Sequence, residues 1–150
     1  MDTQNNESGF RFSDPKLVFS IFIVNKSYNG DFSKIKDIPF KIETQASQIT
    51  ELKDGIHQQA TVMLILKTAD EIEMDETIPC YISASIEAGF AWKKKEYDEN
   101  TLNILLKENA PALLLSYLRQ HIVTLTEASE IPVQHIPFID FTNNVNDDDN

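Results

Sequence analysis

The feature of this chain that most constrains its fold is a long alternation of apolar and polar residues that ends at Trp92. From Ile78 onward every second residue is apolar, and the residues between them include two serines, a glutamate and Gly89. A period of two is typical of a β-strand with one buried face. Because the run exceeds the roughly six residues of an ordinary strand, we expect a bulge or bend near Gly89.

Three earlier segments also have the pattern of strands. Residues 17–25 are rich in β-branched and aromatic side chains and are apolar on both faces. Residues 38–45 alternate as a half-buried strand, and residues 60–67 alternate again after a turn at Gly55. These patterns predict three strands before the long one, with an extended connection over residues 26–37.

Beyond Glu99 the apolar period changes from two to 3.6, which is typical of helices. Leucines soon after Glu99 predict a short helix, and the apolar residues within 114–125 form one stripe of a longer helix. Pro111 fits the first turn of that helix, which we expect to end near Ser129. Residues 131–141 contain two prolines and are expected to be extended. This order predicts an α+β fold in which one long helix packs on a four-stranded antiparallel sheet.

The charge balance excludes several classes of partner. Lys and Arg total 13 and Asp and Glu total 24, which gives a formal net charge of −11. A surface this acidic repels phosphate backbones and anionic lipids, so we expect no nucleic-acid binding and no stable membrane insertion. Because neither a secretory leader nor a membrane-spanning stretch is evident, we expect a cytoplasmic protein. Residues 1–9 and 142–150 are polar and expected to be disordered, which leaves one domain over residues 10–141.

Motifs for catalysis or metal binding are not found in the sequence. The four glycines lie too far apart for a phosphate-binding loop, and the three histidines lack the spacing of metal ligands. Cys80 has no second cysteine with which to form a disulfide or a zinc site. The acids within residues 70–76 lack the glycine-containing register of a calcium loop. We therefore predict no catalytic residue, no metal, no cofactor and no enzymatic activity.

The apolar side chains outnumber the positions that one helix can cover on one sheet. The first predicted strand is apolar on both sides, and the third has Met63 and Ile65 opposite its core face. Either a subunit interface or a binding groove explains this surplus. Aromatic and branched side chains of the long connection and of the C-terminal segment are the candidates for such a groove: Tyr28, Phe32, Ile35, Phe138 and Phe141.

Three segments of the C-terminal half have a recognisable pattern. The run Asn109-Ala110-Pro111-Ala112-Leu113-Leu114-Leu115-Ser116-Tyr117-Leu118-Arg119 begins with a proline-started helix and contains a Tyr-x-Arg step. It is followed by Ile131-Pro132 and by the closing Ile136-Pro137-Phe138-Ile139-Asp140-Phe141. In these segments, in its strand order and in its long first connection, the chain resembles the SecB-type protein-export chaperones. The resemblance extends from about Phe10 to Phe141.

The resemblance implies a homotetramer, built as a dimer of dimers with sheets outside and long helices between subunits. It also implies an ATP-independent chaperone that binds unfolded preproteins in apolar grooves, keeps them competent for export and delivers them to the SecA ATPase of the Sec translocase. The first connection, the main helix and the following segment would frame these grooves. The implied client contacts are Tyr28, Phe32, Ile35, Phe40, Phe138 and Phe141.

Two departures from the family pattern leave other functions open. The family usually continues after the Asp-Phe step with another helix, whereas residues 142–150 have no helical pattern. The family also often exposes a glutamate on the fourth strand that helps to dock SecA, whereas the first acid here is Glu87. The alternatives are a SecB-like holdase outside export, for instance on an antitoxin, a small-ligand-binding α+β oligomer, and a structural adaptor.

Overall fold

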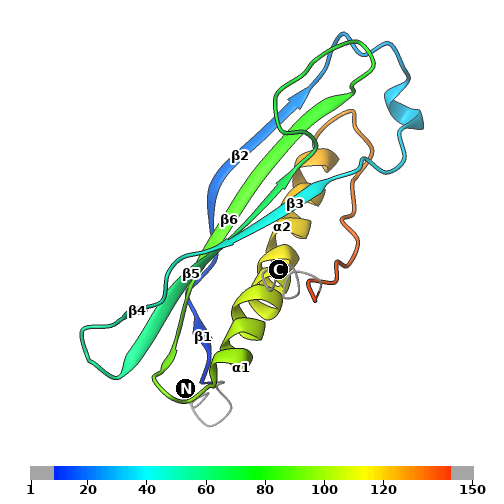
Figure 1. Cartoon of the computed structure of the whole chain (residues 1–150). Coiled ribbons are helices and arrows are strands. Elements are labelled where there is room, and N and C mark those ends of the chain that lie inside the picture. Colours follow the sequence, from blue (N-terminus) through cyan, green and yellow to red (C-terminus); the bar gives the residue numbers. More distant parts are fainter. Residues whose placement is uncertain (1–8, 143–150) are drawn as a thin grey trace, which may run out of the picture.

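The computed structural model describes residues 9–142 as a long twisted sheet with a helical layer along one face (Figure 1). The elements in chain order are β1 (Arg11–Phe12), β2 (Lys16–Val24), the 3₁₀ turn η2 (Phe32–Lys34), β3 (Lys41–Ala46), β4 (Thr50–Glu51), β5 (His57–Lys67), β6 (Cys80–Lys93), α1 (Glu99–Ile104), the π-helical turn η3 (Leu105–Asn109) and α2 (Ala110–Glu127). The predicted α+β arrangement of one long helix on an antiparallel sheet is confirmed. The predicted tails lie almost wholly outside the described residues.

The two longest strands, β5 and β6, form the centre of the sheet and pair antiparallel along the whole of β5. β2 and β1 lie along the free side of β6, and β3 and β4 lie along the free side of β5. The sheet therefore has six strands, and the prediction of four was wrong because each edge is interrupted once.

Both interruptions have the same cause, a serine whose hydroxyl replaces a main-chain partner. Ser13, between β1 and β2, donates its N–H to the Gly89 carbonyl and accepts the Gly89 N–H on its hydroxyl. Ser47, between β3 and β4, donates its N–H to the Thr61 carbonyl and accepts the Thr61 N–H in the same way. The pairing is thus maintained while the edge chain leaves the regular strand geometry.

The predicted irregularity near Gly89 lies on a neighbouring strand instead. β6 pairs with β5 in unbroken register through Gly89. The register shift occurs on β2, between Leu17 and Phe19. An edge strand accommodates an extra residue more readily than a central strand, which must satisfy two ladders at once. This bulge places Phe19, rather than Leu17, on the same face as Ile21 and Ile23.

The helical half is continuous rather than split into two helices. Asp98 caps α1 by accepting the Thr101 N–H. Asn109, although of a residue type that often caps helices, has helical backbone angles and makes no side-chain cap bond. The π turn η3 immediately precedes Pro111, whose ring would crowd the carbonyl four residues earlier in a regular helix. The wider turn lets the chain pass the proline without ending the helix.

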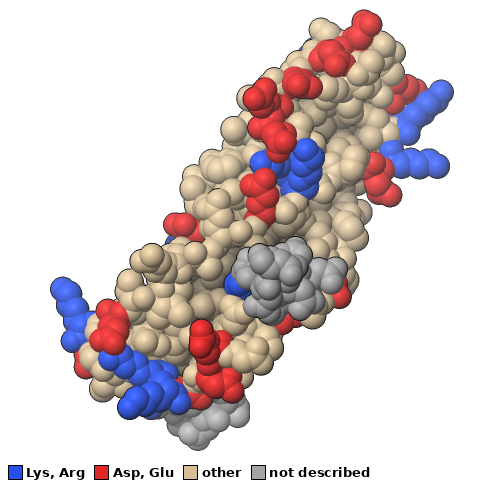
Figure 2. Space-filling model, viewed as in Figure 1, with Lys and Arg blue, Asp and Glu red and all other residues tan. Residues whose placement is uncertain are grey.

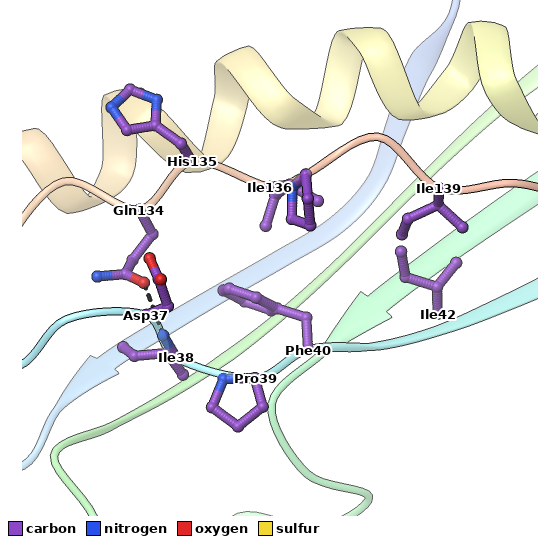
Figure 3. Close-up of a pocket in the computed structure, with 10 residues that line it drawn as sticks. Asp37, Ile38, Pro39, Phe40, Ile42, Gln134, His135, Ile136 and Ile139 are labelled. Carbon is purple, nitrogen blue, oxygen red and sulfur yellow. Dashed lines mark hydrogen bonds between the residues drawn. The ribbon is translucent and has the colours of Figure 1, made fainter.

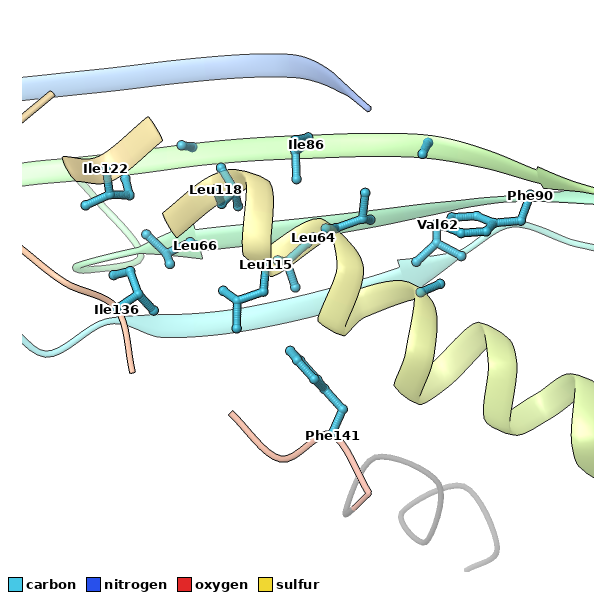
Figure 4. Close-up of a cluster of buried hydrophobic side chains, with 14 of the residues drawn as sticks. Val62, Leu64, Leu66, Ile86, Phe90, Leu115, Leu118, Ile122, Ile136 and Phe141 are labelled. Carbon is cyan, nitrogen blue, oxygen red and sulfur yellow. The ribbon is translucent and has the colours of Figure 1, made fainter. Parts of the chain in front are cut away.

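The core lies between the inner face of β5 and β6 and the buried stripe of α2 (Figure 4). Leu64, Leu66, Leu114, Leu118 and Ile122 are fully buried there. The segment after α2 has no regular secondary structure, as its prolines predict, and it runs back beside the helix. None of the helices within residues 9–142 is long and apolar enough to cross a membrane.

Candidate functional site

The candidate site is a pocket between the connection that enters β3 and the segment that follows α2 (Figure 3). Its cavity has a volume of about 470 Å³. Most of the lining side chains are apolar and come from these two segments: Asp37, Ile38, Pro39, Phe40, Ile42, Gln134, His135, Ile136, Pro137 and Ile139. The pocket is therefore formed by two stretches that lie far apart in the sequence.

Gln134 joins the two walls of the pocket through its side-chain amide. Its Nε2 donates to the Lys36 carbonyl at 2.9 Å and to the Pro132 carbonyl at 2.8 Å. Its Oε1 accepts the Ile38 N–H at 2.9 Å. The side chain is buried, and the Gln134 N–H donates to the Thr126 hydroxyl of α2. The connection, the C-terminal segment and the helix are thus held together through one residue.

Arg119 fixes the C-terminal segment farther along α2. Its Nε donates to the Ile136 carbonyl at 2.7 Å. Its guanidinium lies 4.5 Å from the centroid of the Phe138 ring, a cation–π contact. Phe138 nevertheless leaves 89% of its surface exposed. A large aromatic side chain is therefore presented to solvent on a segment that is itself anchored.

The far end of the connection is fixed by Asn25. Its Nδ2 donates to the carbonyls of Asp75 and Ile78, and its Oδ1 accepts the Ser27 N–H. The turn η2 follows, where Asp31 accepts the Ser33 N–H. Hydrogen bonds from Ser33 lower the pKa of Asp31 below its usual value, so this capping carboxylate stays ionised.

The structure distributes the six predicted contacts among several places. Phe40 lines the pocket, and Phe138 lies on its C-terminal wall segment. Tyr28 and Phe32 contact each other with ring centroids 5.2 Å apart, and Phe32 and Ile35 also pack against the margin of the core. Phe141 is 5% exposed and belongs to the core.

Sequence reasoning missed most of the pocket residues. Ile38, Ile42, Ile136 and Ile139 carry patterns that are equally typical of plain core. One usable signal for Gln134 is present in the sequence, because it is one of only three polar residues, with His135 and Asp140, in the largely apolar Ile131–Phe141. Such a residue is either exposed or fully hydrogen-bonded, and only the structure shows that it is buried.

The described residues contain no arrangement with evident catalytic chemistry. Within residues 9–142 no group of three or more His, Cys, Asp or Glu side chains could hold a metal ion. Burial raises the pKa of the Cys80 thiol to about 11, which keeps it protonated and unreactive. The pocket instead offers apolar side chains and main-chain polar groups, an arrangement suited to binding.

Neither a family model nor a curated protein sequence matches the chain. Among solved structures, the chain is similar to the SecB-like chaperone Rv1957 of Mycobacterium tuberculosis, solved in complex with a ChAD peptide from the HigA1 antitoxin Rv1956. The TM-score is 0.52 at 12% identity, and the match covers 87% of each chain. The fold is SecB-like. A protein of unknown function from Streptococcus agalactiae, with a TM-score of 0.48 and 10% identity over 86% of this chain and 97% of that one, is also similar.

Proposed function

We propose that this SecB-like chain is an ATP-independent chaperone that binds unfolded polypeptide segments. The observation that carries the proposal is the apolar pocket framed by two anchored segments, with the exposed Phe138 on one of them. Its volume lies within the range of about 300–1,000 Å³ that is usual for binding sites. The antitoxin peptide bound to the Mycobacterium tuberculosis protein shows that the same fold accommodates a peptide in that case.

The surface charge is suited to a chaperone that stays in solution while it binds apolar segments. The formal charge of −11 favours solubility, because it makes separate assemblies repel one another. On the face shown in Figure 2, acidic side chains gather at the end near the β5–β6 connection, and broad areas elsewhere carry no charge. Apolar client segments would be bound on uncharged surface, with a gain of about 25 cal/mol per Å² of apolar area buried.

Suppression of aggregation tests this proposal. The full chain, added at a stoichiometric ratio without ATP, is expected to reduce light scattering from a reporter protein diluted out of denaturant. Phe138→Ser is expected to weaken the suppression with little loss of stability, because Phe138 is mostly exposed. Ile56→Ser, at an exposed apolar residue of the β4–β5 turn, is the matched control. A native chain that leaves the scattering unchanged would contradict the proposal.

A chaperone of this kind could serve one of two roles. In protein export it would deliver preproteins to SecA, and outside export it would bind a client such as an antitoxin. On the outer face of β6, Tyr81, Ser83 and Ser85 are buried, and the first acid, Glu87, is half-buried. This arrangement provides little acidic surface for docking on SecA, so we favour a role outside export. Pull-down of SecA by the client-loaded chain would support the export form, and exclusive capture of an antitoxin segment would support the other.

We also propose a homotetramer in which α2 faces another subunit. The outward face of α2 is uncharged over Ala112, Ser116, Tyr117, Gln120 and Thr124, all of them exposed. The hydroxyls of Ser116 and Thr124 donate to carbonyls of their own helix, at Leu113 and Gln120. A face without charge, whose Ser116 and Thr124 hydroxyls are bonded within the helix, is suited to helix packing between copies.

A small apolar ligand is the second candidate for the pocket, since its volume also suits one. The polar atoms of Gln134 are already bonded within the protein, which leaves few groups to orient such a ligand. Saturable binding of a small apolar dye that client peptides do not displace would favour this candidate.

A further inference from the structure

The free edge of β3 presents a defined set of main-chain groups. In an antiparallel pair, residues alternate between those whose N–H and C=O face the partner and those whose groups face away. The Ser47 N–H donates to the Thr61 carbonyl at 2.8 Å, so the odd-numbered residues of β3 face β5. It follows that the main-chain groups of Ile42, Thr44 and Ala46 face away from the sheet.

Within residues 9–142 no strand lies on that side of β3, and the structure gives these outward groups no hydrogen-bond partner. The extended chain begins before β3. From Asp37 to Thr44 the residues alternate strictly between exposed and half-buried. One extended ribbon therefore runs from the pocket into the free edge, and an unpaired edge of this kind is a template for another strand.

The first rung of that ribbon is already occupied. Gln134 accepts the Ile38 N–H and donates to the Lys36 carbonyl, both at 2.9 Å. A carboxamide carries the same C=O and N–H groups as a peptide bond, so Gln134 pairs with the ribbon as a residue of a neighbouring strand would. The Gln134 side chain thus occupies the main-chain groups of Lys36 and Ile38 at this edge. Within the described residues, the main-chain groups farther along the edge have no such partner.

We propose that a client segment binds in extended conformation along the free edge of β3, pairing its main chain with Ile42, Thr44 and Ala46. This inference rests on the proposed chaperone function and specifies how the client is held. The client strand continues the row of amide pairs that Gln134 begins. Strand addition of this type draws affinity from main-chain hydrogen bonds and specificity from pockets for alternate side chains.

The pairing defines the class of client segment. Side chains of Ile42 and Thr44 lie on the helix side of the sheet, where Ile42 is opposite buried Leu66 and lines the pocket. Lys41, Glu43 and Gln45 lie on the solvent side and are exposed. A paired client therefore places every second side chain toward the apolar pocket and the others in water. Segments with apolar residues at alternate positions fit, whatever the residues between them.

Backbone methylation of a client peptide tests this pairing on the native, full chain. The probe is a fluorescent peptide with two bulky apolar residues two positions apart, which favours one register. Single N-methyl groups are placed at successive amides, and affinity is measured by anisotropy. Methylation is expected to weaken binding about 5- to 10-fold at alternate amides, which face β3, and to have little effect at the amides between them.

The peptide amides that face away from β3 serve as chemically matched controls, because they carry the same methyl group. A flat methylation scan with a peptide that binds would overturn the pairing and leave the chaperone proposal standing. If the unmethylated peptide does not bind and the chain does not suppress aggregation, the chaperone proposal itself fails. The two failures are therefore distinguishable.

A variant on the protein side gives a second measurement. Thr44→Pro removes an outward N–H without touching the bonds to β5, and proline is tolerated on edge strands. It is expected to weaken peptide binding by a similar factor, whereas Thr44→Val keeps the N–H and the native affinity. Native affinity in Thr44→Pro would overturn the proposal. A smaller assembly mass for Thr44→Pro without client would also overturn it, because a second copy would then occupy the edge.

Discussion

Gln134 shows how much of this architecture depends on one buried amide. Three side-chain hydrogen bonds and one main-chain bond from this residue connect the chain at Lys36–Ile38, at Pro132 and at α2. The Gln134 side chain is buried, and the main-chain groups that it bonds are part-buried, so water replaces the amide poorly if it is removed.

Gln134→Ala is expected to lower the free energy of unfolding by about 1–3 kcal/mol, because it leaves part-buried main-chain groups without partners. Denaturant titration measures this loss. Gln59→Ala, at an exposed position of β5, is the matched control and is expected to have little effect. A loss no greater than in the control would show that water replaces the amide.

His121 is expected to make the stability depend on pH. Its Nε2 lies 2.7 Å from the Ser20 hydroxyl of β2, and burial lowers the pKa of His121 below 6.5. The unfolded chain therefore binds the proton at higher pH than the folded chain, so this contribution to stability is present above about pH 6.5 and is lost as the pH falls toward the lowered pKa. We expect the free energy of unfolding to decline between about pH 7.5 and about pH 5.5, and to decline less in His121→Gln.

The exposed His135 offers the control for this measurement. His135→Gln keeps His121 and is expected to retain the decline in stability. Equal declines in the native chain and in His121→Gln would mean that other groups set the pH dependence.

At the scale of elements, periodicity in the sequence was sufficient to locate the long strands and the helical half, but not the short strands β1 and β4. Alternation predicted β3, β5 and β6, and the change of period at Glu99 located the helical half. The serine interruptions and the bulge on β2 were not predictable, because they depend on which chain lies opposite. Pro111 lies in the first turn of α2, as predicted, but α2 follows directly on the π turn η3 instead of starting at a cap. Predicting the interruptions and the bulge would require knowing which strands pair in the folded protein.

Substitutions at two turn residues are expected to change the stability in opposite directions. Gly55, in the β4–β5 turn, has φ +70° and no atom within 4 Å of an added Cβ. Gly55→Ala is therefore expected to lose about 1 kcal/mol through backbone strain alone, and Gly55→Asn less. Lys95 has φ +65°, so Lys95→Gly is expected to shift the denaturation midpoint the other way. Shifts of the same sign in Gly55→Ala and Lys95→Gly would contradict this account.

At the scale of the whole molecule, the sequence supported the fold class better than the site. The SecB-like resemblance rested on Asn109–Arg119 and on the proline-flanked ending, and the fold agrees with it. Of the six proposed client contacts, only Phe40 lines the pocket, and Phe141 lies in the core. Aromatic residues are used for cores and for binding surfaces alike, so their identity alone does not separate the two roles.

The proposed tetramer predicts a specific effect of charge on α2. Light scattering is expected to give a mass near four times the 17.1 kDa of the chain. Gln120→Lys adds a charge to the outward face of α2 and is expected to reduce that mass, because a buried unpaired charge disfavours assembly. Gln59→Lys makes the same change on the outer face of the sheet and is expected to leave it unaltered. A monomeric native chain would contradict the tetramer.

The anchoring of the first connection at both ends has a consequence for evolution and for engineering. Asn25 ties one end to the β5–β6 connection, and Gln134 ties the other to the C-terminal segment. The stretch between them, including η2, contributes little to the main hydrogen-bond framework. Apart from Phe32 and Ile35, which pack against the core, its composition and its length can therefore diverge between descendants, or be exchanged in the laboratory, while the scaffold is inherited intact.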